Sequence, residues 1–96
     1  MRSERFTGTV KGMKIIFEHD HFLHYRLSVN GTVTTGELNT ERGFGSDENA
    51  TLFILNPSAP EKEQKYFVRL SSGKIRMLDQ HKKIIQDGQL KKIDMK

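Results

Sequence analysis

The sequence predicts an all-β fold, a small antiparallel meander that closes into a barrel. Turn-forming residues recur at short intervals, and the stretches between them are rich in β-branched, aromatic and aliphatic residues without helical spacing. No segment is long enough to be the crossover helix that parallel strands need. Seven or eight short strands in a meander must curl up to protect their edges, so we expect a lipocalin-like or OB-like barrel.

Residues 5–55 contain five predicted strands, with a predicted turn between the third and the fourth. Asn30-Gly31 tolerates positive φ at both positions and favours a type I′ hairpin. A loop is expected after Thr40, because Gly43, Gly45, Ser46 and Asp47 lie there. Four consecutive apolar residues, 52–55, indicate a central strand covered on both faces. The predicted strands are residues 5–10, 13–18, 22–29, 32–38 and 50–55.

In the second half, residues 56–64 hold both prolines and several charges, which predicts an exposed loop. Ser71-Ser72-Gly73 then joins two strands in a second hairpin. Asp87-Gly88 is expected to be the hinge between the last two strands. These predicted segments are residues 65–70, 74–79, 83–86 and 89–93, and the last two, joined at the hinge, count as one strand in the total of eight.

The length of 96 residues fits one domain, so we expect residues 1–96 to form a single barrel with frayed ends at 1–4 and 94–96. The absence of Cys excludes disulfides, thiolate zinc sites and thiol nucleophiles within this sequence. No apolar run has the length of a membrane helix, and residues 1–10 do not resemble a signal peptide. Membrane attachment is therefore expected only through a lipid anchor outside this sequence.

The formal net charge of +4 is concentrated in the second half. Residues 1–50 carry six Lys/Arg and seven Asp/Glu, and residues 51–96 carry ten and five. A basic half can bind nucleic acid if aromatics lie on its exposed face, and Tyr66, Phe67 and Arg69 resemble such a stripe. Adjacent strand residues point to opposite faces, however, so core packing is the favoured interpretation. A small nucleic-acid-binding barrel remains an alternative hypothesis.

Three of the four histidines, His19, His21 and His24, fall within six positions. On a strand His19 and His21 share a face, whereas His24 points the opposite way unless the segment bends. Imidazoles so placed could bind Cu²⁺ or Zn²⁺. The competing interpretation is an ordinary polar hairpin end. His81 lies in a predicted turn and is expected to be solvated.

The sequence predicts that the chain is not an enzyme. No Ser or Thr lies in a nucleophile signature, and carboxylates such as Glu37 and Glu41 have no feature that distinguishes them from surface charge. Gly43-Phe44-Gly45-Ser46 follows no buried parallel strand and precedes no helix, so it is not expected to bind phosphate in the manner of a P-loop.

From about residue 31 to residue 92, ordered features of the chain resemble the NlpE-like family of bacterial envelope lipoproteins. They are Asn30-Gly31-Thr32, the strand-and-loop segment 36–44 (GELNTERGF), the central segment 50–55 (ATLFIL), the segments 65–70 (KYFVRL) and 74–79 (KIRMLD), and the closing segment 89–92 (QLKK). The resemblance implies a small antiparallel barrel associated with copper tolerance and envelope stress.

The chain departs from that family where copper chemistry is concerned. The family typically carries an anchoring Cys and a Cys-x-x-Cys pair early in the barrel, but the corresponding residues 8–14 (GTVKGMK) contain no Cys. No thiolate copper site is carried over. The resemblance therefore implies a non-enzymatic domain of the bacterial cell envelope, in the outer membrane or periplasm, that binds an envelope protein or a small ligand.

Overall fold

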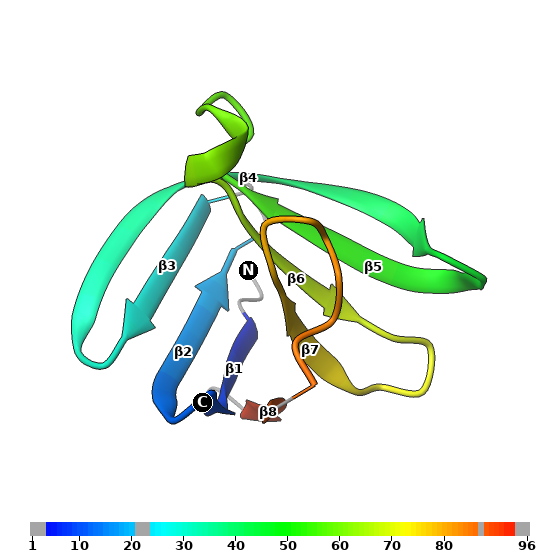
Figure 1. Cartoon of the computed structure of the whole chain (residues 1–96), viewed down its shortest axis with the longest axis horizontal. Helices are drawn as coiled ribbons and strands as arrows, with labels where there is room; N and C mark the ends of the chain where they lie inside the picture. The colour runs from blue at the N-terminus through cyan, green and yellow to red at the C-terminus, as the bar shows by residue number, and fades with distance from the viewer. Residues whose placement is uncertain (1–3, 21–23, 87, 94–96) are drawn as a thin grey trace.

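Eight antiparallel strands follow one another round a closed barrel, and β1 pairs with β8 to complete it (Figure 1). The computed structural model describes residues 4–20, 24–86 and 88–93. The strands are β1 (Glu4–Val10), β2 (Met13–His19), β3 (His24–Val29), β4 (Thr32–Phe44), β5 (Asp47–Leu55), β6 (Lys65–Arg69), β7 (Ile75–Leu78) and β8 (Gly88–Ile93). The prediction of an all-β meander closing into a barrel is confirmed, and its up-and-down strand order is that of the lipocalin-like alternative.

Two-residue turns join β1 to β2 and β3 to β4. Asn30 and Gly31 have φ values of 51° and 90°, the positive pair that a type I′ turn requires, and the Asn30 side chain accepts a hydrogen bond from the Lys14 N–H at 2.8 Å. The expected hairpin is confirmed. Between β5 and β6 the proline-rich segment forms a loop, as predicted, with one 3₁₀ turn, η1 (Glu61–Glu63).

The loop expected after Thr40 is instead part of a long β4–β5 hairpin, which projects from the barrel in Figure 1. β4 continues to Phe44, and Gly45 and Ser46 alone make the turn. The glycine at position 43 had indicated a break, but it occupies a bulge where the register shifts between Arg42 and Phe44. The ladder accommodates the extra residue and continues.

The predicted strand 83–86 is wrong. Only an isolated bridge between Leu78 and Ile84 forms there. The Asp79 carboxylate accepts hydrogen bonds from the backbone N–H groups of His81 and Lys83, at 2.8 and 3.0 Å. This side chain holds the backbone in a turn and so removes a donor that a ladder would need. His81 is exposed, as expected.

The prediction of a frayed end at residues 1–4 needs one correction. Residues 1–3 and 94–96 lie outside the described residues, but Glu4 is the first residue of β1 and pairs in register with His19. Its side chain is 20% exposed and contacts Arg69 and His19. Residues 22 and 23 of the predicted third strand also lie outside the described part, and β3 begins at His24.

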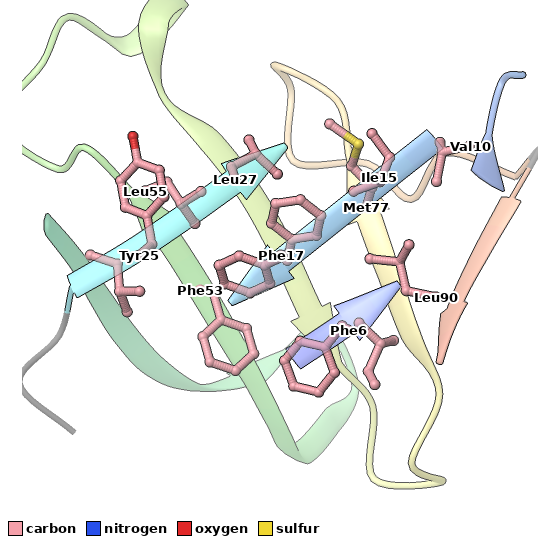
Figure 2. Close-up of a cluster of buried hydrophobic side chains, with 13 residues drawn as sticks. Phe6, Val10, Ile15, Phe17, Tyr25, Leu27, Phe53, Leu55, Met77 and Leu90 are labelled. Atoms are coloured by element: carbon pink, nitrogen blue, oxygen red, sulfur yellow. The ribbon is translucent and has the colours of Figure 1, made fainter. Parts of the chain in front are cut away.

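Alternate residues of the strands fill the barrel interior with apolar side chains, as Figure 2 shows. Four phenylalanines form its centre, and the rings of Phe17 and Phe67 stack with centroids 4.4 Å apart. The buried interior residues are Phe6, Val10, Ile15, Phe17, Tyr25, Leu27, Leu38, Phe53, Leu55, Phe67, Ile75, Met77 and Leu90. The barrel is therefore packed with side chains along this region.

A second apolar cluster covers the outer face of β5, β6 and β7. It consists of Ala50, Leu52, Tyr66, Val68 and Leu78, with Phe44, Ile54, Leu70 and Ile84 packed against it. The central strand predicted from residues 52–55 is confirmed, because Leu52 and Phe53 are buried on opposite faces. The part of the chain that the structure describes contains no helix long and apolar enough to span a membrane.

Candidate functional site at the polar mouth of the barrel

Polar side chains replace the aromatic ones at one end of the barrel. Glu4 precedes Phe6 by two residues, His19 follows Phe17 by two, and Arg69 follows Phe67 by two. Because residues two apart in a strand share a face, all three side chains continue the inward-facing rows. Lys92 likewise follows the buried Leu90 on β8. We call Glu4, His19, Arg69 and Lys92 the polar mouth.

The carboxylate of Glu4 is the centre of the polar mouth. Arg69 Nη1 donates to both of its oxygens, at 2.9 Å to Oε1 and 2.7 Å to Oε2. His19 Nε2 lies 2.9 Å from Oε1, and Lys92 Nζ lies 3.1 Å from Oε2. One carboxylate thus joins β1 to β2, β6 and β8. It ties together strands that are far apart in the chain.

The polar mouth rests on the aromatic core. The His19 ring lies 5.0 Å from the Phe53 ring and 5.9 Å from the Phe6 ring, measured between centroids. The Arg69 guanidinium lies 5.8 Å from the centroid of Phe53, within the range of a cation–π contact. These rings exclude water from beneath the ion pairs, which strengthens the electrostatic interactions above them.

The surroundings of Glu4 lower its pKa. Partial burial raises the pKa, because desolvation disfavours the charged carboxylate, but the hydrogen bond from Lys92 and the charges of Arg69, His19 and Lys92 lower it more. The net result is a pKa below the ordinary value of 4.5. An ionised carboxylate only accepts hydrogen bonds, so His19 Nε2 carries the proton in the pair with Glu4.

We expect Glu4→Gln to lower the free energy of unfolding by about 1–2 kcal/mol at neutral pH, because it removes charge-assisted hydrogen bonds while keeping the side chain's shape. The folded-state pKa lies below the unfolded one, so this stabilisation is complete above about pH 4.5 and is lost as the pH falls through the folded pKa. Urea unfolding from pH 7 to pH 2 should show the two proteins converging in acid. Glu48→Gln, at an exposed position, is the control; a constant difference between wild type and Glu4→Gln at all pH values would contradict the assignment.

The three predicted metal-binding histidines have different positions. His19 faces the barrel interior and pairs with Glu4. His24 has 60% of its side chain exposed and lies 3.7 Å from a carboxylate oxygen of Asp20. His19 and His24 lie on two different strands, β2 and β3, rather than on one strand, and they point to opposite faces because His19 pairs with Tyr25, the neighbour of His24. His21 lies outside the described residues. Within the described ranges no three His, Cys, Asp or Glu side chains gather as metal ligands.

The two aromatic residues of the proposed base-stacking stripe belong to the core. Tyr66 is 1% exposed in the outer cluster, and Phe67 is fully buried in the interior. The Tyr66 hydroxyl donates to Gln64 Oε1 at 2.7 Å, and Arg69 is held by Glu4. Core packing, the favoured interpretation, is confirmed for both aromatics, so neither ring is free to stack on a base.

Comparison of the chain with protein-family models, with curated proteins and with solved structures gives no match.

Sequence reasoning missed the polar mouth. Glu4 and Arg69 are 65 residues apart, and no local pattern links them. In retrospect the sequence holds a usable signal in the predicted strands 5–10, 13–18 and 65–70. At one end of each strand, a polar residue lies two positions from an inward-facing apolar residue and therefore on the same face. Three such positions on neighbouring or facing strands indicate a polar layer.

Proposed function

We propose that the chain is a non-enzymatic binding or sensory domain of the bacterial cell envelope, of the NlpE-like kind. Two lines support the proposal: the ordered strand and turn features in the sequence, and an eight-stranded meander barrel, which is the architecture that the resemblance implies. A link to copper tolerance or envelope stress is the finer part of the proposal. It rests on the resemblance alone.

The observation that supports a binding role is the difference between the apolar interior of the barrel and its polar mouth. Aromatic and aliphatic side chains occupy the interior, so a ligand meets the barrel at its surface. The polar mouth offers preorganised charged groups from four strands, held on an aromatic layer. Charged side chains fixed by packing can recognise a ligand without first being ordered.

The cellular location tests the envelope part of the proposal. The gene, with whatever codons precede Met1 in its genome, should be expressed in its own host with a C-terminal epitope tag. We expect the tagged protein in the periplasmic or membrane fraction, separated from a cytosolic marker enzyme. Recovery of the protein entirely with that marker would refute an envelope role.

A metal role of the histidines stays a prediction. His19 could bind Cu²⁺ or Zn²⁺ only through Nδ1 while its Nε2 donates to Glu4. If the histidines bind metal, calorimetric titration of the wild type with each ion should show saturable binding that is lost in His19→Ala plus His21→Ala. His81→Ala, which changes an exposed histidine elsewhere, is the control. Equal affinity of the double variant and the wild type rules the cluster out.

A further inference from the structure

One edge of β4 has no neighbouring strand beyond Glu37. β3 pairs with β4 as far as Glu37, whereas β5 pairs with the other edge of β4 from Leu38 to Phe44. Within residues 4–20, 24–86 and 88–93, no further strand pairs with β4. In Figure 1 this part of β4 forms the outer margin of the projecting hairpin. An extended segment of another chain can therefore lie beside it without displacing a strand.

The direction of the backbone groups along this edge follows from one hydrogen bond. The Asn56 N–H donates to the Glu37 oxygen at 2.9 Å, and Asn56 directly follows β5, so the backbone groups of Glu37 point toward β5. Opposed residues of an antiparallel pair alternate between hydrogen-bonded and non-hydrogen-bonded positions. The N–H and C=O groups of Leu38, Thr40 and Arg42 therefore point away from β5, toward the free edge. An added strand would satisfy these donors and acceptors.

Two charged side chains of opposite sign lie along the free edge. Thr40 and Arg42 follow the inward-facing Leu38 at two-residue steps, so the Arg42 side chain belongs to the inner face. Glu41 faces Leu52 of the outer cluster and belongs to the outer face. Both charged residues are exposed. Charges and bulges on an edge suppress indiscriminate strand pairing, so this edge selects a partner whose charges are complementary.

A shallow pocket beside the edge can receive a side chain of the added strand. Its lining consists of Thr40, Glu41, Arg42, Asn49 and Thr51. Asn49 and Thr51 precede the inward-facing Phe53 at two-residue steps, so they share the inner face with Arg42. Arg42 Nη2 donates to Asn49 Oδ1 at 3.2 Å, which positions the guanidinium and leaves its other donors for a ligand. A carboxylate that enters this pocket meets a charge-assisted hydrogen-bond donor.

We propose that β4 binds an extended segment of a partner protein by β-strand addition along residues 38–42. An acidic side chain of the segment lies on the inner face against Arg42, and the neighbouring basic side chain lies on the outer face opposite Glu41. Main-chain hydrogen bonds supply affinity, and the two charges supply register and specificity. The proposal does not depend on an envelope location or on the polar mouth.

A second copy of this chain fits the edge less well. Symmetric antiparallel pairing of two β4 edges centred on Glu41 or on Arg42 would place like charges directly opposite each other, which destabilises a ladder. Pairing centred on Thr40 would carry the tip of the second hairpin into β3, because His24 already lies opposite Glu37. A separate extended segment meets neither obstacle.

The test measures fluorescence anisotropy of two labelled synthetic peptides at constant ionic strength. Each has about ten residues, the upper length of a typical strand, and alternates Thr and Val. The charged peptide carries a central Glu followed by Lys, and the neutral peptide carries Gln at both places. We expect saturable binding of both, with the charged peptide tighter. Arg42→Gln should weaken the charged peptide about tenfold, the effect of one charge-assisted hydrogen bond, and leave the neutral peptide nearly unchanged.

Thr40→Pro tests the main-chain hydrogen bonds. Because the Thr40 N–H points away from β5, proline at this edge position should leave the β4–β5 ladder intact, which circular dichroism checks. Its binding of both peptides should be weakened at least about tenfold, since one donor is lost and the ring blocks the added strand. Thr40→Val, which keeps the N–H, is the matched control. If Thr40→Pro does not fold, Arg42→Gln with the two peptides still decides the result.

Amide hydrogen exchange of the whole chain reports the register. In the free chain the Thr40 and Arg42 amides should exchange faster than those of Asn39 and Glu41, and saturation with the charged peptide should slow the first pair only. Slow exchange of Thr40 and Arg42 in the free monomer, no binding of either peptide, or equal affinities of Thr40→Pro and Thr40→Val overturns the proposal. So does self-association in sedimentation that Thr40→Pro abolishes, because the occupant is then a second copy. An envelope location found by fractionation would survive each of these results.

Discussion

Replacing Gly8 with Ala is expected to destabilise the barrel by about 2–3 kcal/mol, the cost of inserting a methyl group where the backbone cannot move away. A Cβ atom at position 8 would overlap the backbone oxygen of Gln89 on β8 and come within 3.0 Å of Leu90 Cδ2. These atoms belong to the seam between β1 and β8, which closes the ring. Urea unfolding monitored by circular dichroism should show a lower midpoint with an unchanged slope.

Gly45→Asn is the control for Gly8→Ala. Gly45 has a φ of 59° and nothing within 4 Å of the added Cβ, and Asn tolerates this left-handed conformation. The same seam contains Gly88, at a φ of 146°, where an added Cβ would lie 2.5 Å from the Thr9 oxygen. If Gly8→Ala unfolds at the same urea concentration as Gly45→Asn, then β1 and β8 can move apart at position 8 without loss of stability. The close approach of the two strands would then not limit the free energy of unfolding.

Phe53→Ala is expected to cost about 3–5 kcal/mol, a large share of the roughly 5–15 kcal/mol that stabilises a typical domain. Phe53 is 1% exposed and contacts the Phe6 and Phe17 rings, with centroids 6.2 and 5.5 Å away. It also lies beneath both His19 and Arg69. Removing the ring leaves a cavity in the core and takes away the support of the polar mouth, so thermal unfolding should shift to much lower temperature.

Two variants separate the loss of packing from the loss of an apolar residue. Phe53→Leu keeps most of the volume and should cost about 1–1.5 kcal/mol. Ile54→Ala changes the next residue, which is only partly buried on the outer face, and should cost less than half as much as Phe53→Ala. Equal effects of Ile54→Ala and Phe53→Ala would mean that the interior does not dominate stability.

The sequence predicts the strands well where one face is buried, because burial leaves alternating or continuous apolar residues. The run at 52–55 and the turn at Asn30-Gly31 are examples, since each depends on neighbours in the chain. Prediction fails at residues 41–49, where the long hairpin leaves the barrel and exposes polar side chains on both faces. It fails at 83–86 because one carboxylate, that of Asp79, redirects the backbone.

The candidate site is harder to predict because its members meet across the barrel. Glu4 was taken for part of a frayed end, yet three basic groups from three strands surround it. The histidine cluster was conspicuous in the sequence, but adjacent strand geometry divides His19 from His24.

The seam between β1 and β8 has a consequence for how the chain folds. Every other strand pairs with its neighbour in sequence, so those pairings close loops far shorter than the whole chain. Joining β1 to β8 instead brings the two ends of the chain together and carries the largest loop-closure entropy in the fold. Because contacts of high sequence separation slow folding, we expect the meeting of the chain's two ends to limit the rate at which this barrel forms. The ion pair between Glu4 on β1 and Lys92 on β8 joins the same two strands, and it helps to hold the ring closed once it has formed.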